Sequence, residues 1–369
     1  QLSSIGYEKH SFHEETMQSK YKIGFLEFNK YQSLYGTGRL IFKNRFFAYL
    51  DSKIFPSYNN RNIRYIDRQK EIFSSGIGYR NDWVLLQFGK GRENWGAGSD
   101  ICLALSDNSA PFNYIKLASD YGSIRVNYIH GFLERTSNGS NRYINGRGIE
   151  WTNKKSAVIS ISEIIIYSGY NRSLDYSYLN PISSHLELEL NNRLNVLGNL
   201  NSNAVWQIHL DFRFNKRSRL SMNYLFDEFV IDPEIEIGKE HGRAYSIKYA
   251  FNILSKEKNI VNVFFTKTLI GTPTFRHGLG TNNFVNDGKP LGWIFGSDGR
   301  NIKIGTSFSR KEKMLGEIYF GLLETGEETI NDRPLEPYKD YLKSSFPSGE
   351  KTQDLIFSAI FQRKLNKIF

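Results

Sequence analysis

Apolar and polar residues alternate along many segments of this chain. From Trp206 to Asn215 every even position is apolar and every odd position is polar or charged, and from Tyr245 to Ile253 the odd positions are apolar. Successive residues of a β-strand point to opposite faces, so each segment would form a strand with one apolar and one polar side. The pattern recurs along nearly the whole chain, which ends at Phe369. The sequence therefore predicts an all-β fold, a transmembrane antiparallel β-barrel of the bacterial outer membrane.

The composition is compatible with a barrel and excludes a helical membrane protein. The mean hydropathy is −0.46, and no stretch approaches the roughly 20 consecutive apolar residues that a spanning helix needs. The 22 tyrosines and 27 phenylalanines suit the aromatic girdles of such barrels. A large soluble β-sandwich would also be rich in aromatic residues, so composition alone leaves both classes open. No apolar segment follows Gln1, so an exported protein would be the mature chain, without its signal peptide.

The net charge of +10 predicts an acidic partner. The candidates are nucleic acid, anionic lipid and acidic polysaccharide, and we expect no nucleic acid because no module that binds it is present. The alternative is that lysines and arginines are simply solvated in turns. Such clusters occur at 153–156, 215–218 and 309–313.

The lengths of the connections give a second test, because outer-membrane barrels have short periplasmic turns and long outer loops. Short and long connections alternate without exception from the C-terminus back to strand 204–214. Two early strands, 38–51 and 21–29, bring the number to an odd 15, whereas single-chain bacterial barrels have even numbers. We predict 16 strands, with 18 as the alternative, and place the missing one in the first 70 residues. The other predicted strands are 354–369, 314–324, 299–309, 260–270, 243–254, 218–230, 204–214, 157–168, 144–152, 123–134, 113–119, 83–92 and 70–80.

No linker, low-complexity tract or change in composition divides the chain. We therefore expect one domain, 1–369, in which residues 1–20 form an N-terminal periplasmic segment. The stretch His185–Leu190 alternates like a strand, but a single crossing there would switch the side of every later turn. We therefore assign 169–203 to one long outer loop that contains a short helix or a folded-back hairpin.

The loop 93–112 predicts a partly plugged lumen. Leu103 and Leu105 need burial, so this loop folds inward over the pore. Trp95 could stack on a sugar ring while neighbouring polar groups bind hydroxyls, and the alternative is that its ring merely fills the barrel mouth. The polar candidates for glycan binding in this region are Arg92, Asn94, Asp100 and Asn108.

A second loop, 271–298, contains Arg276 and His277 as further candidates for glycan binding. Arginine binds carboxylates through two parallel hydrogen bonds, which suits uronic-acid sugars. The alternative is that arginines pair with acidic residues inside the lumen. Glu163, Asp211 and Arg213 are the candidates for such lumen charge pairs.

Groups for catalysis are few. Asp227 and Glu228 are neighbours on a strand and point to opposite faces, so they cannot form a glycosidase pair. No nucleophile-elbow or phosphate-loop motif occurs. His10 and His13 could gather a metal, but a mobile N-terminal segment is the preferred interpretation. We expect no enzyme, no cofactor and no metal. The lone Cys102 is expected to be a small buried apolar side chain.

The loop after Gly89 resembles the signature loop of the Wzi-type capsule assembly proteins. The resemblance rests on Gly89-x-Gly-Arg-Glu-Asn-Trp-Gly-x-Gly98, on Leu105-Ser106 and on Asn108-x-Ala-Pro111, and it spans about residues 70–369. Three other features match the same family less specifically. They are Glu163, Tyr178-Leu179-Asn180-Pro181 and Asp227-Glu228-Phe229-x-x-Asp232.

This resemblance implies an outer-membrane barrel whose external face acts as a lectin and holds capsular polysaccharide at the cell surface. Better-known members carry a helical bundle on the periplasmic side, and about 20 residues before the first predicted strand are too few for one. We therefore expect a non-catalytic barrel that binds acidic surface polysaccharide through its outer loops and that contacts outer-membrane lipid. The alternatives are a structural subunit of a larger envelope complex and a pore for polysaccharide or small solutes.

Overall fold

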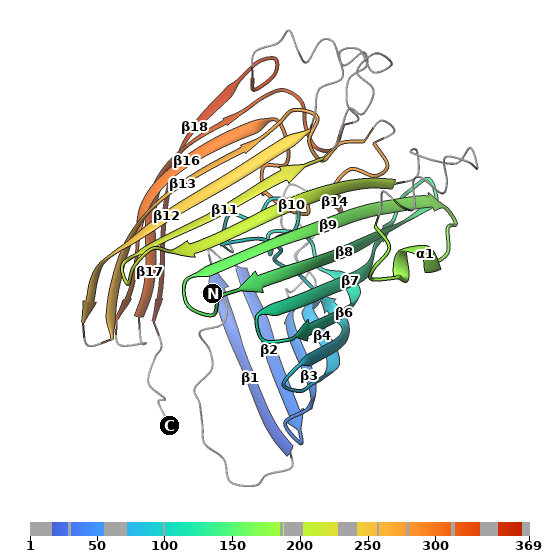
Figure 1. Ribbon diagram of the computed structural model, residues 1–369, viewed down its shortest axis with the longest axis horizontal. Coiled ribbons are helices and arrows are strands. Elements are labelled where there is room, and N and C mark those ends of the chain that lie inside the picture. The colour runs from blue at the N-terminus through green and yellow to red at the C-terminus, as the bar shows by residue number, and fades with distance from the viewer. Residues whose placement is uncertain are drawn as a thin grey trace.

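The protein is seen in a computed structural model (Figure 1), which describes residues 17–28, 31–54, 72–98, 100–184, 187, 202–227, 242–256, 258–277, 280–310, 314–332 and 346–363. Sixteen strands form one sheet, in which each strand pairs antiparallel with the next in the chain. They are β1 (Met17–Phe28), β2 (Tyr31–Phe42), β3 (Phe46–Ile54), β4 (Ile72–Arg80), β5 (Val84–Gly91), β6 (Phe112–Asp120), β7 (Ile124–Arg135), β8 (Ser140–Thr152), β9 (Ala157–Tyr170), β10 (Ser202–Arg213), β11 (Ser218–Phe226), β12 (Arg243–Lys256), β13 (Asn259–Ile270), β16 (Gly299–Arg310), β17 (Met314–Thr325) and β18 (Thr352–Arg363).

The remaining elements are small and lie in the long connections. A two-stranded hairpin, β14 (Val285–Asn286) and β15 (Lys289–Pro290), lies between β13 and β16, and α1 (Tyr176–Leu179) follows β9. The sheet curves around the connection that carries β14, whereas α1 lies outside the sheet, and short hairpin turns lie at the opposite end from these connections (Figure 1). The antiparallel fold and the count of 16 strands are confirmed. In the described part of the chain, no helix has the length and apolar character needed to cross a membrane.

The missing strand comes from a hairpin that the sequence pattern hides. We predicted one strand over 38–51, whereas β2 and β3 meet there at a tight turn, with Arg45 N donating to Phe42 O. Lys43 and Asn44 both have positive φ, as in the type I′ turns that suit two-residue hairpins. The prediction of a single strand was wrong because the turn residues Lys43, Asn44 and Arg45 include neither glycine nor proline, the strongest sequence markers of a turn.

The N-terminal boundary also differs from the sequence prediction. β1 begins at Met17, so the predicted N-terminal segment 1–20 overlaps the first strand. The long connection after β9 does contain a short helix, α1, as expected. Most of His185–Leu190 lies outside the described residues.

The two faces of the sheet differ as the alternation predicted. On β9 and β10, Ile161 and Ile208 point outward and are 56% and 40% exposed, whereas Gln207 and His209 point inward and are buried. Because these apolar side chains are exposed in the isolated chain, they form the surface that would contact lipid.

An apolar core fills the long-loop end of the barrel on the inner face. The plug segment, residues 92–111 between β5 and β6, contributes Trp95, Leu103 and Leu105. Other members come from the connection between β13 and β16 and from inward positions of β7–β10. They are Phe275, Phe284, Leu291 and Trp293, and Ile129, Ile144, Ile164, Ile166 and Val205. The predicted inward folding of the plug is confirmed.

Candidate functional site

Backbone contacts hold the plug segment together and involve several of the predicted glycan-binding residues. Trp95 N donates to Leu105 O at 3.1 Å, which folds the segment into a narrow loop. Arg92 Nε donates to Ser109 O at 2.6 Å, and Asn94 Oδ1 accepts from Asp107 N at 2.8 Å. Arg92 is half-buried, whereas Asn94 remains exposed. Both side chains therefore stabilise the loop that carries them.

Trp95 is wedged between the plug and the inner wall. Its side chain is 8% exposed. A Cβ placed on Gly146 would lie 3.3 Å from the indole Cη2, and one on Gly148 would lie 3.4 Å from Cζ3. These two glycines of β8 therefore make room for the ring. The burial supports the alternative stated above, in which Trp95 fills the barrel mouth.

Asn223 on β11 anchors the plug to the wall, and sequence analysis did not identify it. Its Oδ1 accepts from Ala97 N at 2.7 Å, and its Nδ2 donates to Ala97 O at 2.9 Å and to Ile101 O at 3.1 Å. His209 Nδ1 lies 2.8 Å from the same Oδ1, and Ser246 Oγ donates to Ile101 O at 2.6 Å. The only available signal was that polar residues occupy inward positions of adjacent strands.

The plug and the connection between β13 and β16 form one body. Trp293 N donates to Leu103 O at 3.0 Å, and Ser106 donates to Leu291 O through its backbone N and to Gly292 O through its Oγ. A Cβ on Gly292 would overlap the Leu103 carbonyl, so only glycine allows this approach. Asn286 Nδ2 also donates to Ala110 O at 3.2 Å. Two loops far apart in sequence thus share one core and one set of hydrogen bonds.

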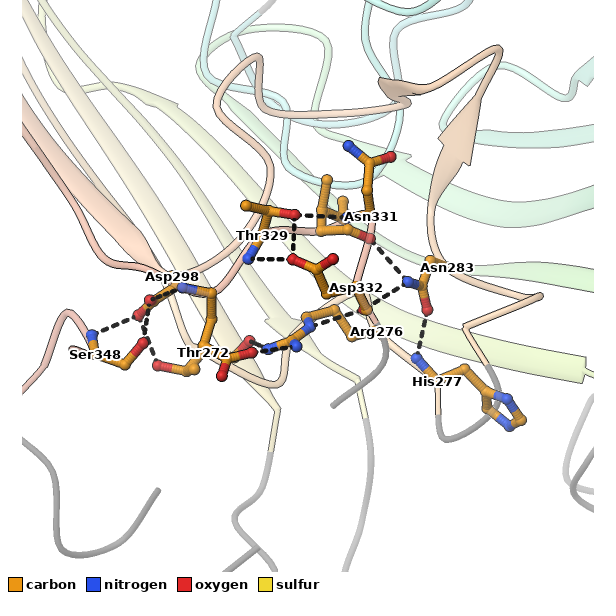
Figure 2. Close-up of polar contacts among 11 residues, drawn as sticks. Thr272, Arg276, His277, Asn283, Asp298, Thr329, Asn331, Asp332 and Ser348 are labelled. Atoms are coloured by element: carbon orange, nitrogen blue, oxygen red, sulfur yellow. Dashed lines mark hydrogen bonds and ion pairs between the residues drawn. The ribbon is translucent and has the colours of Figure 1, made fainter. Parts of the chain in front are cut away.

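Arg276 is part of a buried network beside this body (Figure 2). Its side chain has no exposed area, and it forms an ion pair with Glu328. Its Nε donates to Asp332 O at 3.1 Å and its Nη1 donates to Thr272 O at 3.2 Å. The arginine therefore joins two outer loops, and its guanidinium forms its hydrogen bonds and its ion pair within the protein.

Asn283 and Asp298 complete the network (Figure 2). Asn283 accepts from His277 N at 2.7 Å and donates to Asp332 O at 2.9 Å. Asp298 accepts from Thr272 Oγ1 at 2.7 Å and from Ser348 N at 2.9 Å. His277 itself is half-buried. In the described residues, these contacts tie two connections, β13–β16 and β17–β18, into a fixed surface.

Asp100 and Asn108, the other predicted residues of the plug, are both exposed. Asp100 Oδ2 forms an ion pair at 2.6 Å with Lys248 Nζ, from an inward position of β12. Asn108 N donates to Ser106 Oγ at 3.2 Å, which leaves its amide side chain at the surface. The plug therefore brings Arg92, Asn94, Trp95 and Asn108 into one loop, while Arg276 and His277 belong to the other.

Of the three candidates for lumen charge pairs, Asp211 forms an ion pair on the inner face, where Arg219 Nη2 lies 2.5 Å from Asp211 Oδ2. Arg213 is exposed and donates to Lys155 O at 2.6 Å, so it stabilises the neighbouring turn. The cross-strand residue Arg219 was within reach of Asp211, whereas Arg213 lies beyond it at the end of the same strand.

Glu163 lies on the outer face, and the prediction that it lines the lumen was wrong. It shares its parity on β9 with exposed Ile161, and it pairs in register with Arg147 and Trp206. Arg147 Nε lies 3.2 Å from Glu163 Oε2, and Trp206 Nε1 donates to Oε1 at 2.8 Å. The reason that a carboxylate can lie on the lipid side is that protein covers it.

The cover is the segment 171–184, which folds back over the outer face near α1 (Figure 1). Tyr178 stacks on Tyr167 with ring centroids 4.1 Å apart. Its carbonyl accepts from Asn145 Nδ2 at 2.8 Å, and Asn180 O accepts from Arg147 Nη1 at 3.3 Å. We call this segment the outer flap. It shields a polar patch that bare lipid would not tolerate.

Cys102 lies inside the plug and is buried, as expected. Burial raises the pKa of its thiol to about 12, with nearby Asp107 and Asp100 adding to the shift. Asp227 is buried too and accepts from Phe275 N. Residues 228–232 of the less specific family match, like His10 and His13, lie outside the described residues.

Comparison with known proteins supports the fold. No family model and no curated protein matches the sequence. Among solved structures, Wzi, an outer-membrane protein involved in group 1 capsule assembly in Escherichia coli and a carbohydrate-binding β-barrel, is similar with a TM-score of 0.60 and 12% identity. The match covers 84% of this chain and 70% of that one. The outer-membrane channel DcaP of Acinetobacter baumannii gives a TM-score of 0.45 at 8% identity, covering 90% and 83% of the two chains.

The chain has the fold of a bacterial outer-membrane β-barrel. At 12% identity the likeness to Wzi concerns the fold, and it agrees with the barrel that the resemblance in the plug implied. In this setting the short turns face the periplasm and the long loops face the cell exterior. The plug, the network around Arg276 and the outer flap therefore all lie at the outer end.

Proposed function

We propose that this barrel binds an acidic surface polysaccharide through its outer loops and holds it without chemical change. The observation that carries the proposal is that two outer loops share one apolar core inside the barrel mouth. Loops held in this way present a fixed surface, which favours binding because little ordering is needed when a ligand arrives. The description of the similar Wzi structure as a carbohydrate-binding barrel supports the same conclusion.

The candidate binding surface consists of exposed polar groups on these two loops. The plug contributes Asn94, Asp107 and Asn108, and the hairpin β14–β15 contributes Asp287 and Lys289. The hydrogen bond between Asn286 and Ala110 holds the hairpin beside this part of the plug. Amide groups can bind sugar hydroxyls, and Lys289 supplies a cation for a uronic-acid carboxylate.

Binding should be tested with substitutions of exposed residues. Arg92, Trp95 and Arg276 are poor choices, because their loss would disturb the loops themselves. We expect Asn108→Ala with Lys289→Ala to lower retention of the detergent-purified barrel on immobilised alginate, a uronic-acid polymer. The matched control is Lys216→Ala, an exposed lysine at the opposite end. Equal retention of the double variant and the parent protein would refute the proposal.

A pore is the second candidate function, because charged side chains line the barrel on the periplasmic side of the plug. Lys248, Lys303 and Glu317 occupy inward positions on strands β12, β16 and β17, and Asp100 of the plug forms an ion pair with Lys248. A planar-bilayer conductance measurement separates the two functions. A binding barrel with a closed mouth gives little current, whereas a pore conducts without any change in the plug. The role of a subunit in a larger envelope complex stays a prediction.

A further inference from the structure

The periplasmic turns carry basic residues around nearly the whole barrel. Basic side chains lie in or beside the turns after β2, β4, β8, β10, β12 and β16, and all of them are exposed. One from each turn is Lys43, Arg80, Lys154, Lys216, Lys256 and Arg310. We call this set the basic rim. These exposed cations thus lie at the end opposite the candidate glycan surface.

Among the described residues, acidic groups at the same end are fewer than basic ones, and most of them are paired, whereas Asp82 in the turn after β4 is exposed. Asp120 and Glu150 both form ion pairs with Arg125, at 2.9 and 3.1 Å, and Asp211 pairs with Arg219. The outer loops, in contrast, mix both signs of charge. Lys289 and Lys351 are exposed there together with Asp107, Asp287 and Glu327. The periplasmic end therefore has a positive field that these acids do not cancel.

Exposed aromatic side chains adjoin the basic rim along the chain. Phe46 follows the turn after β2, Trp83 follows Arg80, Trp151 precedes Lys154 and Phe214 precedes Lys216. Trp151 shares its parity on β8 with lipid-facing Ile149. Aromatic rings of this kind mark the level of lipid headgroups in barrels. The cations beside them lie where long basic side chains reach lipid phosphates.

We propose that the basic rim binds the phosphate groups of anionic phospholipids in the inner leaflet of the outer membrane, and so selects the lipids that surround the barrel. The distribution of charge identifies lipid as the partner. A protein partner would contact only one sector of the rim. The cations instead occur in successive turns around the barrel, and the inner leaflet also surrounds the barrel on all sides. Each basic residue near an anionic membrane surface strengthens association about fivefold.

Tryptophan fluorescence can measure this preference at a single turn. In a Trp83→Phe background, Trp151 is the exposed tryptophan nearest to Lys154 and Lys155. The barrel is reconstituted into phosphatidylcholine vesicles that contain brominated phosphatidylglycerol or brominated phosphatidylcholine, which quench nearby tryptophans. We expect the anionic lipid to associate at least about fivefold more strongly at low salt. This preference should fall in about 0.5 M salt, because exposed charges are then screened.

Substitutions then assign the preference to the rim. Lys154→Gln with Lys155→Gln should bring the lipid ratio close to one, whereas Lys154→Arg with Lys155→Arg should keep it. Lys351→Gln in the outer loops is the matched control and should leave the ratio unchanged. The heat-dependent mobility of the folded barrel in electrophoresis verifies folding, and Lys155→Gln alone replaces the double variant if that does not fold.

Two results would overturn the proposal. One is a ratio near one in the parent protein at low salt. The other is an unchanged ratio in the glutamine variant. Binding of soluble dextran sulfate by the detergent-solubilised barrel, without any lipid preference in vesicles, would assign the rim to an acidic polymer instead. None of these outcomes depends on whether the outer loops bind alginate.

Discussion

The outer and periplasmic halves of strands β7–β10 distribute polar and apolar side chains differently. In the periplasmic half, the outer face carries exposed Val126, Ile149 and Ile161, and the inner face carries polar side chains such as His209. In the outer half, the inner face is apolar, and the outer face carries buried Asn145 and Glu163 beside an aromatic cluster. The inner face of the same strands therefore reverses from polar to apolar, while the outer face gains buried polar groups.

The covering elements explain the reversal. In the outer half, the plug covers the inner face and the outer flap covers the outer face, so neither face meets its usual solvent. Ile164 and Ile166 pack in the shared apolar core, while the carbonyl of Tyr178 accepts hydrogen bonds from the polar patch on the other side. Strand polarity thus follows what lies against each face rather than the membrane alone.

The largest expected effect comes from breaking the buried ion pair on the outer face. Arg147→Met should destabilise the folded barrel by about 3–5 kcal/mol, because Glu163 would remain as an uncompensated buried charge. Urea unfolding in lipid vesicles measures this loss. Arg147→Met with Glu163→Met should recover much of it, since no buried charge is then left. A single variant as stable as the parent protein would show that the outer flap does not exclude water.

A charge on the lipid side of the periplasmic half should have a smaller but clear effect. Ile161→Arg introduces a cation on bare lipid-facing surface, at a cost of about 2–4 kcal/mol near the bilayer midplane. The same urea titration gives the value, and Ile161→Leu is the control of similar volume. If Ile161→Arg cost less than about 1 kcal/mol, the face at this level would not contact hydrocarbon.

The sequence predicted the periplasmic half correctly because there lipid and a polar lumen impose one alternation throughout. It failed in the outer half for a physical reason. Glu163 follows Ile159 and Ile161 at the same parity, so no local signal tells that the flap covers it. Likewise, the sequence around Arg276 indicates a surface arginine. Its contacts with Glu328 and Asp332, which show that it is buried, come from distant parts of the chain. The inward folding of the plug was predictable, because Leu103 and Leu105 cannot remain in water.

Loosening the plug should convert the closed mouth into a leaky one. Asn223→Ala removes three hydrogen bonds to the plug, to Ala97 N, Ala97 O and Ile101 O. Leaving those buried groups without their partner costs about 1–3 kcal/mol, enough to increase the open fraction about fivefold or more. Single-channel recording should show openings that are rare in the parent protein. Ser221→Ala is the control, because Ser221 is an inward position on the same strand whose hydroxyl donates to Asp211.

Cys102 gives the smallest effect and reports directly on plug closure. Its pKa of about 12, against an ordinary 9, means that almost no thiolate exists at pH 8, so maleimide labelling of the folded barrel should be very slow. Because the thiol stays protonated in the folded state, stability is unaffected below pH 9 and falls as the pH rises toward 12. Asn223→Ala should speed labelling by the same factor as it increases channel opening. Rapid labelling of the parent protein at pH 8 would mean that the plug opens frequently, and the contrast between the two halves of the barrel would then describe only its closed state.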